Sequence, residues 1–119
     1  MACYETKEDY VFKDVPESSE LVQGVIISKL DLQAVKEGNV SNAYLKTVLS
    51  PAYKDEYVQI RVVCSGNENE SLFTREILLM YGESYTVKES FSLVPSQFAN
   101  ALKLQIRTND INAWSTIRI

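Results

Sequence analysis

Two carboxylates are the residues of this chain whose spacing could support catalysis. The 119 residues include no histidine, which excludes Ser-His-Asp and Cys-His arrangements and the commonest zinc ligand. The two cysteines, Cys3 and Cys64, cannot build a four-ligand zinc site, and no glycine-rich phosphate loop is present. A hairpin over residues 74–91 would place Glu76 opposite Glu89, and two close carboxylates can share a proton. General acid–base catalysis also needs a cleft, which the sequence does not imply. We therefore expect no catalytic residues, no metal site, no cofactor and no enzyme.

Aromatic side chains offer a second kind of chemistry, because exposed rings on a rigid sheet can bind sugars. The chain has one tryptophan, Trp114, and seven tyrosines. Tyr57, Gln59 and Arg61 are expected on the outward side of a strand over residues 57–65. The inward side of this strand is expected to carry Val58, Ile60, Val62 and Cys64. A lone tryptophan in a strand usually packs in or over the core, and this interpretation competes with ligand binding for Trp114. Tyr57 and Trp114 are the candidate ligand-binding residues of a carbohydrate- or cell-surface-binding module.

Strands must position these residues, and the clearest strand signal covers residues 74–91. Residues 85–91 alternate between two faces, as expected for a strand with two different environments. The dipeptide Gly82-Glu83 suits a two-residue type II′ turn, in which glycine comes first because that position needs φ > 0. The sequence therefore predicts a β-hairpin with Gly82 at its tip.

The two faces of this predicted hairpin differ in what could cover them. The two-residue turn leaves Ile77, Leu79 and Tyr81 on a second face that is more apolar than a solvated sheet should be. It also sets two glutamates opposite each other, which is unfavourable, and a three-residue turn would shift the register by one; we favour the two-residue turn. The predicted core face consists of Leu78, Met80, Tyr85, Val87 and Phe91.

Two explanations are open for the apolar second face: another layer of the same chain covers it, or another subunit does. The N-terminal residues 1–20 bear on the second explanation, since aromatics could tie a terminal segment to a neighbour. This segment is interpreted as an acidic arm or as an edge strand. The candidate interface residues are Tyr10, Phe12, Ile77, Leu79 and Tyr81.

The spacing of strand signals predicts the fold class. Seven to eight alternating segments are separated by turn signals every eight to twelve residues, and no helix of normal length is expected. We predict a single antiparallel β-sandwich, jelly-roll or immunoglobulin-like, over residues 21–119. At most one short helical turn is expected near residues 95–101.

The charge of the chain is unevenly distributed, and this bears on its partners. Residues 1–20 carry six acidic and two basic residues, so the whole net charge of −4 lies there. Nucleic acid and anionic membranes both favour basic surfaces, and neither is expected as a partner. No segment is long enough to span a membrane, and no signal peptide is visible. Synthesis in the cytoplasm is therefore expected, although the final location stays open.

The sequence favours a non-enzymatic structural or assembly module that acts through protein–protein contacts, as a homo-oligomer or in a larger assembly. A small virion component, such as a capsid decoration, adaptor or tail-associated protein, fits this interpretation and would carry the chain into a virion. The alternative is the carbohydrate- or cell-surface-binding sandwich, for which a glycan is the partner. Because one fold serves many roles, fold alone does not decide between the two.

Overall fold

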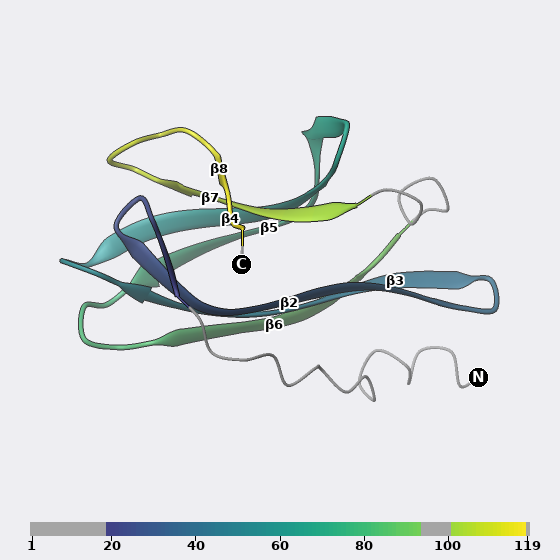
Figure 1. Cartoon of the computed structure of the whole chain (residues 1–119), viewed down its shortest axis with the longest axis horizontal. Helices are drawn as coiled ribbons and strands as arrows, with labels where there is room; N and C mark the ends of the chain where they lie inside the picture. The colour runs from purple at the N-terminus through teal and green to yellow at the C-terminus, as the bar shows by residue number, and fades with distance from the viewer. Residues whose placement is uncertain (1–18, 94–100, 119) are drawn as a thin grey trace.

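The computed structural model describes residues 19–93 and 101–118, which form two layers of antiparallel strands (Figure 1). Long runs rich in β-branched and aromatic residues form the strands, and Gly or Asn residues lie at several of the connections. The eight strands are β1 (Glu20–Val22), β2 (Val25–Glu37), β3 (Val40–Pro51), β4 (Glu56–Cys64), β5 (Asn67–Leu79), β6 (Tyr85–Ser92), β7 (Leu102–Thr108) and β8 (Ser115–Thr116).

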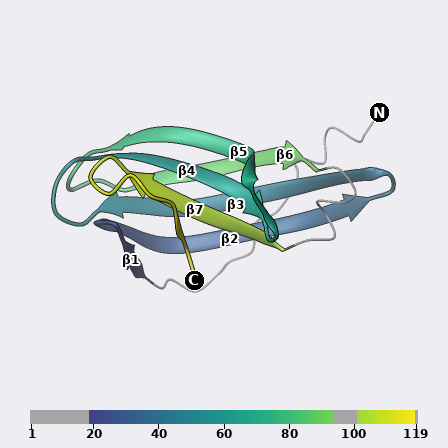
Figure 2. The same ribbon diagram turned by 90° about the horizontal axis from the view of Figure 1, so that it is seen from above.

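The strands make two four-stranded sheets that pack face to face. The first sheet has the order β1-β2-β3-β6 and the second has the order β5-β4-β7-β8. Figure 2 shows the two layers from above, with the strands of one running over those of the other. The predicted all-β antiparallel sandwich is therefore confirmed. The strand order of its first sheet differs from that of an immunoglobulin domain. In an immunoglobulin sheet the first and second strands are followed by the fifth and then the fourth.

Apolar side chains from both sheets fill the space between the layers. In β4 the residues Val58, Ile60 and Val62 are completely buried, and Cys64 is also buried, as their alternation predicts. Burial raises the pKa of the Cys64 thiol. The central cluster consists of Val25, Ile27, Leu45, Leu49, Val58, Ile60, Val62, Ile77, Leu79, Val87, Leu104, Ile106 and Ile117.

The predicted hairpin over residues 74–91 is wrong, because its two strands belong to different sheets. Strand β5 pairs with β4, whereas β6 pairs with β3. A turn does form at the predicted place, but the N–H of Glu83 donates to the carbonyl of Met80 (3.1 Å), and Gly82 has φ of 92°. The positive φ therefore lies at the third turn residue, as in a type II turn, rather than at the second. Type II turns splay the flanking strands, so the chain crosses from one sheet to the other.

The assignment of the two faces of β5 is also corrected. Ile77 is 4% exposed and Leu79 is 1% exposed, so both belong to the core rather than to an exposed second face. Leu78, Met80 and Tyr85 were expected in the core and are 57%, 46% and 40% exposed. Of the two explanations for the apolar second face, cover by the same chain is the correct one for Ile77 and Leu79. Tyr81 is 60% exposed, and its role at an interface stays a prediction.

Strands β5 and β6 still contact each other, but across the gap between the layers. The rings of Phe73 and Phe91 stack with centroids 5.4 Å apart and an interplanar angle of 10°. Next to them, Arg75 forms an ion pair with Glu89, and both side chains are about one-third exposed. These inward-facing side chains close one open edge of the sandwich, since β5 and β6 are edge strands of their sheets.

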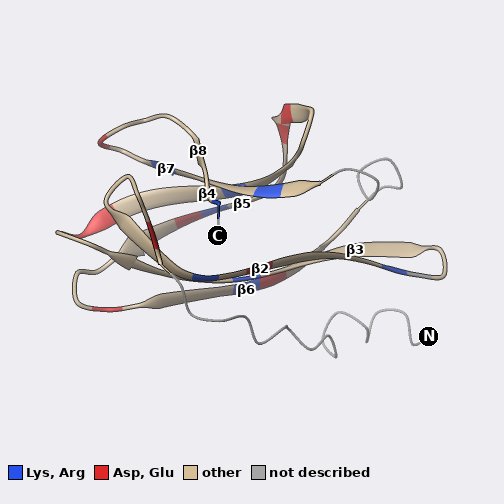
Figure 3. Ribbon diagram, in the orientation of Figure 1, with Lys and Arg blue, Asp and Glu red and all other residues tan. Residues whose placement is uncertain are grey.

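The charges in the described residues are mixed rather than segregated. Figure 3 shows acidic and basic positions on both layers. Within residues 19–93 and 101–118, the structure contains no helix long and apolar enough to cross a membrane. The candidate residues Tyr10 and Phe12, most of the segment 1–20 and most of the predicted helical turn lie outside the described residues.

Candidate functional site

The outer face of the second sheet carries the candidate site, and strand alternation determines which side chains point there. Because Val58 and Ile60 point into the core, Gln59 between them must point outward. Gln59 pairs with Glu76 of β5 on one side and with Arg107 of β7 on the other. Residues that are directly opposite on neighbouring strands share a face. The side chains of Glu76, Gln59 and Arg107 therefore form one row across three strands.

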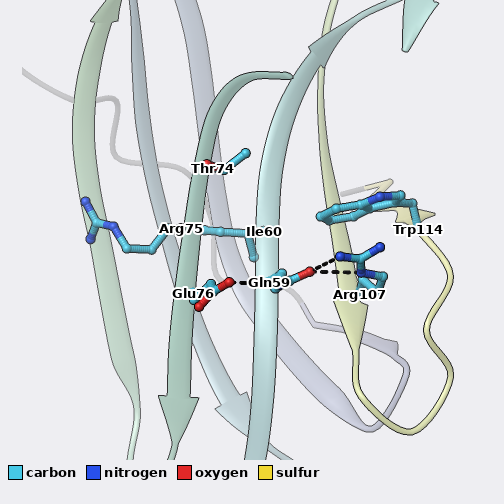
Figure 4. A pocket seen from close by; sticks show the side chains of 7 residues that line it. All are labelled: Gln59, Ile60, Thr74, Arg75, Glu76, Arg107 and Trp114. Atoms are coloured by element: carbon cyan, nitrogen blue, oxygen red, sulfur yellow. Dashed lines mark hydrogen bonds between the residues drawn. The ribbon is translucent and has the colours of Figure 1, made fainter. Parts of the chain in front are cut away.

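A trough of about 510 Å³ lies along this row (Figure 4). This volume is within the range of pockets that bind small ligands. Figure 4 shows Trp114 to one side, Glu76 and Thr74 on β5 to the other, and Gln59 between them. The lining residues are Gln59, Ile60, Thr74, Arg75, Glu76, Arg107 and Trp114. The trough therefore has Trp114 and Arg107 on one side and the polar side chains of β5 on the other, with β4 between them.

Hydrogen bonds connect the row into one network. Nε2 of Gln59 donates to Oε2 of Glu76 (3.0 Å), and Nε of Arg107 donates to Oε1 of Gln59 (2.9 Å). Nη2 of Arg107 donates to the same Gln59 oxygen, and the Tyr57 hydroxyl donates to Oε1 of Glu76. Each side chain in the row is thus held by a neighbour, which preorganises its polar atoms for a ligand.

Trp114 orders two arginines of the sheet surface, of which only Arg107 lines the trough. The guanidinium carbons of Arg61 and Arg107 lie 4.2 Å and 4.6 Å from the centroid of the indole ring. Such cation–π contacts stabilise by about 0.5–2 kcal/mol each. Nε of Arg61 also donates to Oε1 of Gln105 (2.8 Å). Trp114 is half-buried and packs on arginines of the sheet surface, so it belongs neither to the core nor to a fully free stacking surface.

A glutamine from the first sheet holds Trp114 in place. Gln23 lies in the turn between β1 and β2, with a positive φ of 53°. Its Nε2 donates to the carbonyl of Ala113 (2.6 Å) and to Oγ of Ser115 (2.9 Å), and its Oε1 accepts from the N–H of Thr108 (2.8 Å). Ala113 and Ser115 directly precede and follow Trp114 in sequence. A single side chain thus fixes the segment that carries the indole.

The hydrogen bonds and charges of this network shift the pKa values of the side chains in and beside the row. Hydrogen bonds from Tyr57 and then Gln59 hold the pKa of the Glu76 carboxyl below its ordinary value, and the charge of Arg107 adds to this effect. The same bond to Glu76 raises the pKa of the Tyr57 hydroxyl. Burial and the like charge of Arg107 lower the pKa of Arg61. At neutral pH Glu76 is therefore an ionised acceptor that faces a charged donor, Arg107.

The structure brings together some of the sequence-predicted site residues and separates others. Trp114 lines the trough, and Tyr57 reaches its margin through the bond to Glu76, so both candidate ligand-binding residues share one face. Glu76 and Glu89 do not form a carboxylate pair, because Glu76 points outward and Glu89 points between the sheets toward Arg75. No group of three or more potential metal-binding side chains occurs in the described part of the chain.

Several residues of the site were missed at the level of sequence. Alternation already placed Gln59 and Arg61 on the outward side of their strand, but nothing local marked them as neighbours of Arg107. The role of Gln23 had no sequence signal, because its hydrogen-bond partners are 83 to 92 residues away. In comparisons with known proteins, no family model and no curated protein sequence matches the chain.

Proposed function

We propose that the protein is a non-enzymatic glycan-binding module that holds its ligand in the trough on the second sheet. One observation carries the proposal: on a rigid sheet, an indole packs beside one end of a hydrogen-bonded row of charged and amide side chains. Pockets of this kind fix a ligand with a few well-placed polar groups beside an apolar surface. Sugars match both features, because they have apolar C–H faces and hydroxyls that donate and accept hydrogen bonds.

The position of the row on strands supports this function further. Gln59, Glu76 and Arg107 lie on three paired strands rather than on loops, so their spacing changes little when a ligand arrives. Each is also bonded to a neighbour, which lowers the entropy cost of ordering it on binding. The edge of Trp114 and the open polar atoms of the row would contact the ligand together.

A glycan array followed by calorimetry tests the proposal. We expect the full chain to bind at least one glycan and Trp114→Ala to reduce its affinity at least about tenfold, since the variant removes the indole and frees Arg107. Tyr53→Ala is the matched control, because Tyr53 is 70% exposed and lies outside the trough lining. Unfolding midpoints of both variants show whether each is folded. Absence of binding across a broad array contradicts the proposal.

Protein assembly is a second candidate function, favoured by an apolar group of side chains at the end of β5. Leu78, Met80 and Tyr81 are 57%, 46% and 60% exposed. Light scattering at high protein concentration tests it: assembly should be present and should weaken in Met80→Asp, whereas a monomer throughout contradicts it. Membership of a virion stays a prediction from the sequence.

A further inference from the structure

We infer that the trough selects a neutral sugar, which places two neighbouring hydroxyls between the carboxylate of Glu76 and the guanidinium of Arg107. The inference rests on the proposed glycan-binding function and adds the ligand class. It follows from three features of the row: the unused hydrogen-bonding capacity of its two ends, the balance of their charges, and the size of the gap between them.

The two ends of the row offer opposite hydrogen-bonding capacity. An ionised carboxylate has about four acceptor positions, and the bonds from Tyr57 and Gln59 occupy two of those on Glu76. A guanidinium has five donor hydrogens, and the two bonds to Gln59 occupy two of those on Arg107. A ligand must therefore donate at one end and accept at the other. A hydroxyl group can do either, so two hydroxyls of one sugar satisfy both ends.

The charges that line the trough cancel. Arg75 is neutralised by its ion pair with Glu89, and Arg61 stacks on the indole of Trp114 without lining the trough. Glu76 and Arg107 remain, with one charge of each sign, and neither forms an ion pair with another side chain in the described residues. An anionic sugar would meet the like charge of Glu76, and a cationic sugar would meet that of Arg107. A neutral ligand avoids both repulsions.

The distance between Glu76 and Arg107 matches the length of one small polar group together with its two hydrogen bonds. The amide of Gln59 bridges Glu76 and Arg107 through the hydrogen bonds drawn as dashed lines in Figure 4. These bonds are 3.0 Å long to Glu76 and 2.9 Å long from Nε of Arg107. Hydroxyls on two neighbouring carbons of a sugar ring form a group of similar size. Such a pair can lie above the amide, donate to Glu76 and accept from Arg107. Sugars that lack one of these hydroxyls would leave a charged group without its partner.

The test compares neutral, acidic and amino-containing glycans on an array, and then measures affinities by calorimetry with the full chain. We expect neutral glycans to bind best. Glu76→Gln and Arg107→Gln should each lower the affinity for the best neutral glycan about tenfold or more, because hydrogen bonds to charged groups contribute most. Glu76→Gln should also improve binding of carboxylate-bearing glycans relative to neutral ones, since it removes the like charge.

Two control variants make the same chemical changes away from the trough. Glu83→Gln and Arg118→Gln each remove one charge at an exposed position that does not line the trough. Both should bind the best neutral glycan with the affinity of the parent protein. A loss in these controls equal to that in the trough variants would attribute the effect to net charge and overturn the inference.

The remaining outcomes separate this inference from the proposed function. Preference for acidic or amino-containing glycans overturns the neutral-ligand inference and leaves the glycan-binding function intact. Full affinity in both Glu76→Gln and Arg107→Gln likewise overturns the inference alone. Failure to bind any glycan removes the proposed function and the inference with it. If Arg107→Gln does not fold, Arg107→Lys keeps the charge but loses the planar donor geometry, and it should still weaken binding.

Discussion

The two neighbouring leucines of β5 provide the sharpest test of the fold that creates the site. Leu79 is 1% exposed and belongs to the central cluster, whereas Leu78 is 57% exposed on the outer face. Replacing each by alanine makes the same chemical change on opposite faces of one strand. Both variants change the strand propensity in the same way. The difference between their free energies of unfolding therefore reports how deeply each leucine is buried.

The expected magnitudes follow from that exposure. Leu79→Ala removes buried methyl groups and leaves a cavity, which lowers the free energy of unfolding by about 2–5 kcal/mol. Leu78→Ala changes an exposed position and should stay within about 0.5 kcal/mol of the parent protein. At a urea m-value of about 2 kcal/mol/M, the middle of the range for small proteins, the Leu79 variant should unfold at roughly 1–2.5 M lower urea.

Urea unfolding followed by circular dichroism measures both variants under one condition, with equal m-values as the check for two-state behaviour. A larger loss for Leu78→Ala than for Leu79→Ala would refute the observed register and restore the face assignment predicted from sequence. That result would also turn Glu76 inward, because residues two apart on a strand share a face. The row of Glu76, Gln59 and Arg107 would then not exist.

Three further predictions concern the groups that support the trough. Gln23→Ala should lower the free energy of unfolding by about 1–3 kcal/mol, because it leaves buried partners unsatisfied, and should shift tryptophan emission; an unchanged spectrum and stability would contradict its role. Glycan binding should be constant at neutral pH and fall only below the ordinary range of glutamate, since Glu76 has a lowered pKa and must be ionised. Tyr57→Phe should move this loss to higher pH, and a coincident profile would exclude the bond. A double-mutant cycle on Arg75 and Glu89 should give a coupling of about 0.2–1 kcal/mol that decreases with salt, as for partly exposed pairs; zero coupling at low salt would contradict the cross-sheet contact.

Local sequence predicts the strands of this protein well, because alternation depends only on which residues meet the core. The residues Val58, Ile60 and Val62 alternate with polar neighbours and are all buried as predicted. The turn at Gly82 was also predicted at the correct place. Its type was not, since a glycine with positive φ fits either central position of a turn and the two choices send the next strand in different directions.

The candidate site is less predictable, because it is assembled by strand pairing. The hydrogen-bonded row joins Gln59 to a residue 17 positions away and to another 48 positions away. The chain crosses from one sheet to the other between β5 and β6 instead of forming a hairpin. The two faces of β5 were therefore predicted the wrong way round, and Ile77 and Leu79 were interpreted as an exposed surface. Tyr57 is exposed and Trp114 is half-buried, so their selection as ligand-binding residues stays a prediction. The arginines that pack on Trp114 follow only from the sheet order.

Chemical-shift mapping of the amide resonances during titration with the best-binding neutral glycan tests the location of the site most directly. The largest shifts should fall on Gln59, Thr74, Glu76 and Arg107, together with the indole N–H of Trp114. The first sheet should show only small shifts, because it faces away from the trough. Shifts concentrated on the first sheet, or on Leu78 and Met80 without the trough residues, would contradict the proposed binding site.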